Sequence, residues 1–109
     1  IPRDRIALDP GIGFGKTVDH NLDLIRHAGA FHDLGCVLLY GVSRKRFVGT
    51  LDVRYPSDGG APVKARVPGS LAAGLAAFDR GVHILRVHDV AETRQARAVW
   101  AGVRFGAGG

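Results

Sequence analysis

The sequence predicts an α/β fold in which parallel strands alternate with helices. Short apolar runs end at a polar residue or a glycine. After each run, apolar residues recur at the helical spacing of three or four positions. This succession of strand and helix occurs three times within 109 residues. Consecutive units of this kind place their strands in parallel and join them by right-handed crossovers.

The first unit is a strand over residues 5–8 and a helix over about residues 21–31, with Asp19 as the expected N-cap. The second strand covers residues 36–40, a continuous apolar run of the kind that is buried on both faces of a parallel sheet. The stretch LDVRYPSDGGAPVKARVPGS, residues 51–70, is rich in Pro and Gly and predicts a long loop.

The second helix is expected over residues 71–79, with Ser70 as its cap. The third strand covers residues 82–87. Asp89 is followed three residues later by Glu92, and this spacing predicts a capping box at the start of the third helix.

Chain length limits the architecture to one domain, because the chain has 109 residues and an apolar content of 46%. Three strands cannot close a (β/α)8 barrel, which takes about 250 residues. A glycine-rich tail follows the last helix. We therefore expect the C-terminal three βα units of a TIM (β/α)8 barrel over residues 1–105, and a disordered tail over residues 106–109.

Composition excludes several classes of protein. The sequence has neither an apolar run long enough to span a membrane nor a secretion signal at its start. Its single cysteine, Cys36, rules out an internal disulfide, fits a reducing cytoplasm and is expected to be buried. The net charge of +5 favours an anionic partner, but the scattered basic residues argue against nucleic acid.

The stretch DPGIGFGKT, residues 9–17, looks at first like a phosphate-binding loop. However, Pro10 stands where a P-loop requires its first glycine, and proline has no N–H to donate. A dinucleotide motif that begins at Gly11 would have Lys16 in place of its third glycine. What remains is a strand that ends at the carboxylate of Asp9, followed by a glycine-rich turn.

Polar side chains follow all three predicted strands, at the edge where α/β folds place their functional residues. These candidates are Asp9, Ser43, Lys45, Arg86 and His88. Arg86 and His88 alternate along one strand, so both side chains point to the same side. A guanidinium beside an imidazole suits a phosphate or pyrophosphate.

Each candidate also has a simpler interpretation. Asp9 can be a turn residue, Ser43 a turn or cap residue, and Lys45 part of a solvated basic loop. Arg86 and His88 can serve an ion pair with the aspartate that follows them. The other histidines lack the spacing of a metal pair, so we expect no metal site in this chain.

Three stretches together, LDPGIGFGKTVDHN, GVSRKRFVG and RVHDVAETRQA, resemble dihydropteroate synthase, the pterin-binding (β/α)8 enzyme family of folate biosynthesis. The resemblance extends from Ile6 to Val103 and corresponds to the last three βα units of that barrel. It implies a transferase that joins 6-hydroxymethyl-7,8-dihydropterin pyrophosphate to 4-aminobenzoate and releases pyrophosphate.

By motif position, the resemblance assigns the pterin and pyrophosphate to four side chains. Asp9 would bind the N–H edge of the pterin, and Lys45 its ring oxygen and nitrogen. Arg86 would pack over the pterin face and reach phosphate, while His88 would bind the pyrophosphate. Lys45, Arg86 and His88 are the expected catalytic residues.

The resemblance assigns the 4-aminobenzoate carboxylate to Ser43, with Phe14 and the aliphatic part of Lys45 lining that pocket. Breaking the C–O bond places negative charge on the leaving pyrophosphate. Preorganised cationic and hydrogen-bonding groups stabilise that charge, so no nucleophilic side chain is required.

Parts of the family site are missing from this sequence, including an Asn for magnesium and pyrophosphate and the residues of the N-terminal half. The resemblance therefore implies Mg2+ as a cofactor without a protein ligand in this chain, and a cytoplasmic homodimer. We expect the chain alone to be inactive or weakly active. The alternative is a non-catalytic half-barrel that binds phosphate or pterin ligands or completes a partner chain.

Overall fold

The protein forms one parallel sheet in this computed structural model, which describes residues 7–12, 17–56 and 60–106 without the side chain of Asp33. The strands lie in the order β1 (Ala7–Leu8), β2 (Val37–Tyr40) and β3 (Ile84–Leu85). Both neighbouring pairs are parallel. The predicted α/β fold with parallel strands is confirmed, although β2 and β3 are shorter than expected. Residues 5 and 6 of the first predicted strand lie outside the described residues. The tail after Gly106, for which disorder is expected, lies outside the described residues.

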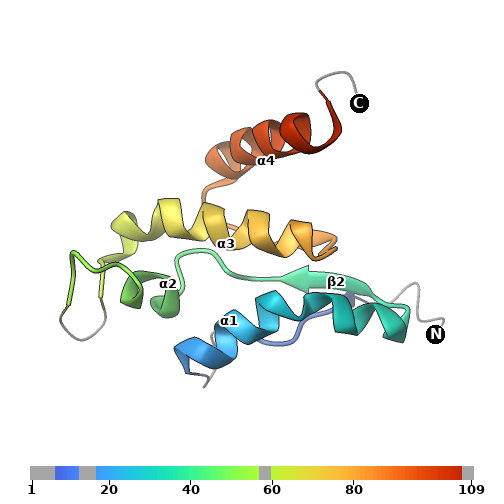
Figure 1. Ribbon diagram of the computed structural model, residues 1–109. Helices are drawn as coiled ribbons and strands as arrows, with labels where there is room; N and C mark the ends of the chain where they lie inside the picture. Colours follow the sequence, from blue (N-terminus) through green and yellow to red (C-terminus); the bar gives the residue numbers. More distant parts are fainter. Residues whose placement is uncertain (1–6, 13–16, 57–59, 107–109) are drawn as a thin grey trace.

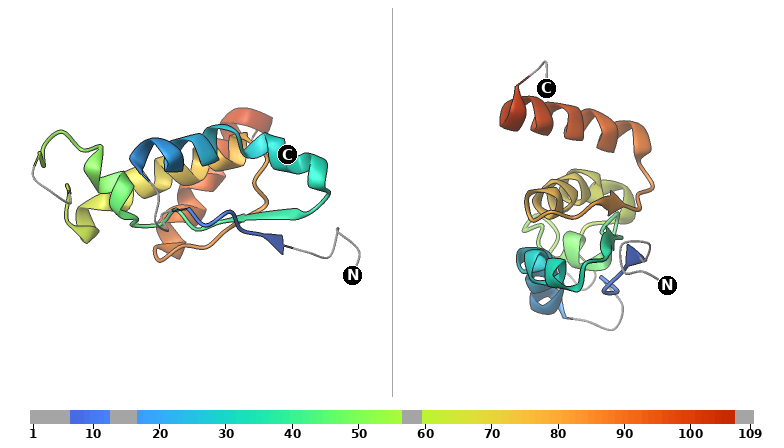
Figure 2. Two further views of the ribbon diagram at one scale, coloured as in Figure 1. Left: turned by 90° about the horizontal axis from the view of Figure 1, so that it is seen from below. Right: turned by 90° about the vertical axis from the view of Figure 1, so that its right-hand side faces the viewer.

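Helices connect the strands and cover one face of the sheet. They are α1 (Val18–Arg26), the 3-10 helix η2 (Ala28–Leu34), α2 (Arg46–Thr50), the 3-10 helix η3 (Val63–Arg66), α3 (Val67–Asp79) and α4 (Val90–Phe105). Helices α1 and α3 lie side by side over β2, and α4 packs on the far side of α3 (Figures 1 and 2). The sheet with its outer helices therefore has the layering of a barrel wall.

The start of α1 differs from the prediction. The helix begins at Val18, and its N-cap is Thr17, whose side chain accepts a hydrogen bond from the His20 N–H at 3.1 Å. Asp19 lies in the first turn instead, where its negative charge interacts favourably with the positive end of the helix dipole. The α-helix gives way to 3-10 geometry from Ala28 onward, so the predicted continuous helix is wrong there.

Helix α3 begins four residues earlier than predicted, at Val67. Ser70 is not a cap. Its hydroxyl lies inside the helix, donates to the Arg66 carbonyl at 2.7 Å and accepts from the Arg44 N–H at 2.7 Å. The stretch expected to be a loop, residues 51–70, also contains η3 and the first turn of α3.

Helix α4 begins where the sequence predicts, but not because of the predicted capping box. Asp89 is the N-cap residue by position, but its side chain makes no capping hydrogen bond. The carboxylate binds the Arg44 guanidinium instead, so the predicted capping box with Glu92 is wrong. The apolar stripe of α4 is only partly covered, since Val99 and Val103 are 64% and 84% exposed.

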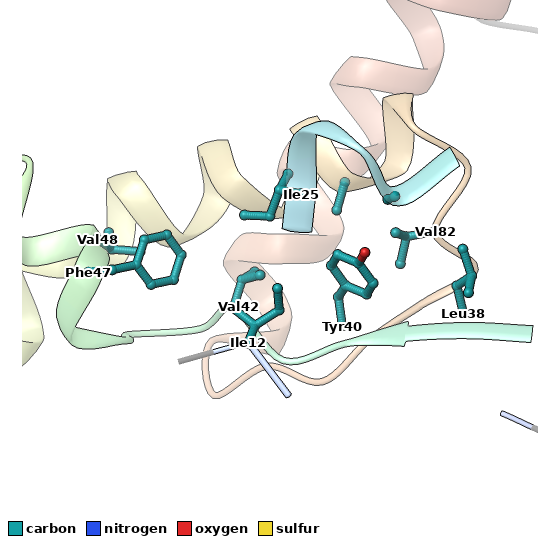
Figure 3. Packing of buried hydrophobic residues seen from close by; sticks show 10 residues of the cluster. Ile12, Ile25, Leu38, Tyr40, Val42, Phe47, Val48 and Val82 are labelled. Carbon is teal, nitrogen blue, oxygen red and sulfur yellow. The ribbon is translucent and has the colours of Figure 1, made fainter. Parts of the chain in front are cut away.

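The core lies between the sheet and the helices α1 and α3 (Figure 3). Leu38 and Tyr40 of β2 point into it and are fully buried, whereas Val37 and Leu39 on the opposite face are half-buried. The sheet is therefore fully covered on one face only. Cys36, predicted to be buried, is half-buried at the start of β2.

Tyr40 anchors the sheet to α1. Its hydroxyl donates to the Leu24 carbonyl at 2.7 Å. Burial, with a smaller contribution from the charge of Asp9, raises the pKa of Tyr40 to about 12. In the described ranges, no helix is both long and apolar enough to cross a membrane.

Candidate active site

The C-terminal ends of the three strands bring four of the predicted site residues together in two pairs. Asp9 after β1 faces Arg86 after β3, with 3.7 Å between Oδ2 and Nη2. Ser43 after β2 contacts His88, also after β3. Parallel strands end at a common edge, which is why positions far apart in the sequence meet there.

Asp9 uses its two carboxylate oxygens differently. Oδ1 accepts a hydrogen bond from the Gly11 N–H at 2.9 Å and so closes a local turn. Oδ2 faces Arg86, and a third of the side chain is exposed. The turn-forming interpretation is therefore correct for one oxygen, while the other faces the Arg86 guanidinium.

Arg86 lies across the backbone of β2. Its N–H donates to the Tyr40 carbonyl at 3.0 Å, which extends the pairing of β2 and β3 by one residue. Its guanidinium lies against Gly41, where a Cβ atom would stand 2.8 Å from Nη2. The side chain is 59% exposed, so the guanidinium remains accessible to an anionic ligand while Asp9 holds one edge.

Ser43 is buried, and its hydroxyl is used twice by His88. It accepts from the His88 backbone N–H at 3.1 Å and lies 3.0 Å from Nδ1 of the same residue. The tautomer of His88 decides which of the two groups donates in the contact between Oγ and Nδ1. In the neutral tautomer that accepts from Ser43 at Nδ1, His88 carries its proton on Nε2 and can donate it to an anionic oxygen.

Lys45 and Phe14 complete the predicted set. Lys45 is half-buried and occupies the N-cap position of α2, directly after the turn that carries Ser43. Phe14 lies outside the described residues, so its expected place in the 4-aminobenzoate pocket stays a prediction. The buried hydroxyl of Ser43 is engaged by His88, which differs from its expected use as a carboxylate ligand.

The structure also reveals an ion pair that the sequence did not indicate. Arg44 binds Asp89 through two parallel hydrogen bonds, one of them from Nε to Oδ2 at 2.9 Å. Those hydrogen bonds lower the pKa of the Asp89 carboxyl below its usual range. The alternative that paired Arg86 with Asp89 is wrong, because Arg86 faces Asp9 instead.

The resemblance implies a magnesium ion, which prefers oxygen ligands. Within the described ranges, no three His, Cys, Asp or Glu side chains are grouped so that they could hold a metal ion.

Comparison with known proteins identifies the family. A family model described as pterin binding enzyme matches residues 1–88. The dihydropteroate synthase of Escherichia coli K12 is 42% identical over 99 residues, which are 91% of this chain and 33% of that protein. The chain thus spans about a third of the length of that relative.

Solved structures agree. The Xanthomonas albilineans dihydropteroate synthase in complex with 7,8-dihydropteroate matches with a TM-score of 0.85 and 43% identity, over 96% of this chain and 38% of that one. The Thermus thermophilus enzyme in complex with 4-aminobenzoate matches with a TM-score of 0.78 and 45% identity, over 90% and 38% of the two chains. The chain therefore belongs to the pterin-binding enzyme family, and its fold is a partial TIM barrel like that of the dihydropteroate synthases.

Proposed function

We propose that this chain supplies one part of the active site of a dihydropteroate synthase in folate biosynthesis. The observation that supports this most is the meeting of Asp9 with Arg86, and of Ser43 with His88, at one edge of a parallel sheet. The proposed reaction condenses 6-hydroxymethyl-7,8-dihydropterin pyrophosphate with 4-aminobenzoate. Pyrophosphate leaves the pterin methylene carbon, which bonds to the amine nitrogen as that amine loses a proton.

Asp9 and Arg86 form the proposed pterin site. A carboxylate oxygen accepts hydrogen bonds from the N–H edge of a pterin, and Oδ2 of Asp9 is the oxygen that the local turn leaves available. The planar guanidinium of Arg86 can stack on an aromatic ring while its N–H groups reach phosphate oxygens. Lys45, at the N-cap position of α2, is proposed to bind the ring oxygen and nitrogen.

His88 is the proposed pyrophosphate ligand. Its Nδ1 and backbone N–H are both directed at Ser43, which leaves Nε2 as the donor for an anionic oxygen. Donors fixed before the reaction stabilise charge that develops on a leaving group without reorganisation. Lys45, Arg86 and His88 are therefore the proposed catalytic residues, and Ser43 and Phe14 are proposed for the 4-aminobenzoate site.

The complete site needs groups beyond this chain. We propose that magnesium binds with ligands outside the described residues, and that the whole protein is a cytoplasmic homodimer. The exposed Val99 and Val103 of α4 require cover, either from the rest of the barrel or from a second copy. On its own, the chain is expected to have little or no turnover.

One observation favours the rival function, a half-barrel without catalysis that completes a partner chain. The face of β2 that carries Val37 and Leu39 is only half-buried, and such a face favours pairing. A chain that assembles with no partner would contradict the half-barrel. Assembly with a partner, in the absence of pterin binding, would support the half-barrel.

The test uses the chain alone and a chimera in which it replaces the matching part of the Escherichia coli enzyme. Calorimetric titration with the pterin pyrophosphate, with magnesium present, measures binding. Turnover of the chimera measures catalysis. Arg86→Ala should weaken both, whereas Arg94→Ala removes the same charge from exposed α4 and should change neither. An active chimera that is insensitive to Arg86→Ala contradicts the proposed roles.

A further inference from the structure

Two adjacent contacts join the turn after β2 to the turn after β3. The first is the contact of Ser43 with His88 described above. The second is the bidentate ion pair of Arg44 with Asp89, in which the two side chains are 30% and 15% exposed. Two parallel N–H to oxygen bonds fix both distance and orientation, which a single bond does not.

The backbone of Arg44, like its side chain, is fixed by hydrogen bonds. Its φ is +54°, the only positive φ of a non-glycine residue in the described part of the chain. This left-handed conformation is unfavourable for a residue with a Cβ atom, so surrounding contacts must maintain it. The N–H donates to Ser70 Oγ at 2.7 Å, and the carbonyl accepts from Arg66 Nη1 at 3.1 Å.

The left-handed turn decides where its two neighbours point. Ser43 precedes it and reaches His88, while Lys45 follows it and begins α2. A relaxed Arg44 backbone would redirect both neighbours, because one changed φ rotates the chain on either side of it. The fixed conformation thus couples Lys45 on one turn to His88 on the other.

Charge gives the pair a second role. Asp89 directly follows His88, and an unpaired carboxylate there would repel a pyrophosphate and compete with it for cationic side chains. Binding to Arg44 neutralises this carboxylate and ties both of its oxygens away from the site.

We propose that Arg44 and Asp89 are positioning residues, which hold Lys45 and His88 in the geometry that binds the pterin and its pyrophosphate. Neither side chain need touch the substrate. The inference rests on the proposed function and extends it to a pair of residues that bind each other rather than the ligand.

The test compares Arg44→Ala, Asp89→Ala and the double variant in the chimera. Each single change should raise KM for the pterin pyrophosphate and lower kcat/KM by about tenfold or more. The double variant should lose no more than the worse single variant, because the two residues act as one unit. Arg44→Lys keeps the positive charge but cannot form the two parallel hydrogen bonds of a guanidinium. Its activity should therefore lie between that of Arg44→Ala and that of the unmodified chimera.

The matched control is Arg54→Ala, which breaks another Arg–Asp pair, with Asp52, on the exposed loop. It should leave KM and kcat unchanged. Hydrogen exchange at the His88 amide, which donates to Ser43, should accelerate in Arg44→Ala and not in Arg54→Ala. Thermal unfolding of each variant separates loss of positioning from loss of folded protein.

Three results would overturn the inference: losses that follow only the folded fraction, additive losses in the double variant, or unchanged KM and exchange. If the unmodified chimera turns over and Arg86→Ala abolishes activity while Arg44→Ala does not, this inference alone fails. If the unmodified chimera neither turns over nor binds the pterin pyrophosphate, the proposed function fails and the inference falls with it.

Discussion

Gly41 lies directly beneath the guanidinium of Arg86. A Cβ atom at position 41 would stand 2.8 Å from Nη2 and 3.3 Å from Cζ of that arginine. Gly41 is buried, yet the nearest atoms belong to the flexible end of a side chain rather than to the backbone. A side chain at this position would therefore clash with the guanidinium of Arg86, a proposed ligand-binding group, and not with the core.

We predict that Gly41→Ala in the chimera displaces the guanidinium and weakens its pairing with Asp9. Affinity for the pterin pyrophosphate should fall by about tenfold, whereas the melting temperature should change little, because Arg86 can move aside. Calorimetry and thermal unfolding measure the two effects. Gly102→Ala is the matched control, since nothing lies within 4 Å of its Cβ position, and it should preserve affinity.

The strand ends could be predicted from the sequence because they depend on local pattern. The apolar run that stops at Asp9 identifies its own boundary. The alternation through Arg86 and His88 placed the end of the third strand too late, because β3 ends at Leu85. Parallel pairing then brings those ends to one edge. The resemblance supplied the roles of the residues, which local pattern does not contain.

Two of the errors have a common physical cause, namely bonds between residues far apart in the sequence. Ser70 looks like a helix cap because an apolar helical stretch follows it, but its hydroxyl accepts from the backbone of Arg44, 26 residues earlier. Asp89 has the spacing of a capping box, but an ion pair with Arg44, 45 residues away, takes its carboxylate. Local windows of sequence contain neither partner.

The Asp89 carboxyl should make the stability of the chimera sensitive to acid. Its pKa is lowered by the hydrogen bonds from Arg44, so the folded state binds its proton less tightly than the unfolded state. The resulting stability is present above the ordinary aspartate range, near about pH 4, and is lost as pH falls through the lowered pKa.

Denaturant unfolding between neutral pH and about pH 3 measures this effect. The free energy of unfolding should fall less steeply with acid in Asp89→Asn than in the parent. Hydrogen bonds from Arg54 also lower the pKa of the Asp52 carboxyl. The curve of the parent alone therefore does not separate the contribution of Asp89 from that of Asp52. Parallel curves for parent and variant would contradict the prediction.

Tyr40 should act at the opposite end of the pH scale. Its pKa is raised to about 12, whereas an unfolded tyrosine ionises near about 10. The stability it contributes is fully present below about pH 10 and is lost as pH rises through the folded pKa. Ultraviolet absorbance of the phenolate, followed during alkaline titration, should show one tyrosine that ionises late, and Tyr40→Phe should remove it.

The same substitution tests the hydrogen bond from Tyr40 to the Leu24 carbonyl. Tyr40→Phe keeps the packing of the ring and removes the hydroxyl, so it should lower the free energy of unfolding by about 1 kcal/mol at neutral pH. Tyr55→Phe is the control, because Tyr55 lies on the loop after α2 and outside the core cluster. Equal losses in the two variants would show that the Leu24 bond contributes nothing of its own.

Gly60 should tolerate substitution less well than Gly41, because it has both a positive φ and a backbone atom close to its Cβ position. Its φ is +62°, and a Cβ atom would stand 2.2 Å from the carbonyl oxygen of Gly49, which belongs to the backbone and cannot rotate away. That carbonyl also accepts a hydrogen bond from the Ala61 N–H at 3.0 Å, which closes the loop onto α2. Gly60→Ala must break this closure or carry both the steric clash and the conformational strain.

We expect Gly60→Ala to lower the free energy of unfolding of the chimera by about 2 kcal/mol or more. Since α2 begins at the residue after Lys45, the loop closure also supports the turn that carries this lysine. Substrate affinity should therefore fall even at temperatures where the variant remains folded. Gly106→Ala shares the positive φ, but its Cβ would have no atom within 4 Å, so its smaller loss measures conformational strain alone. A Gly60→Ala variant no less stable than Gly106→Ala would show that the contact with Gly49 can relax without cost.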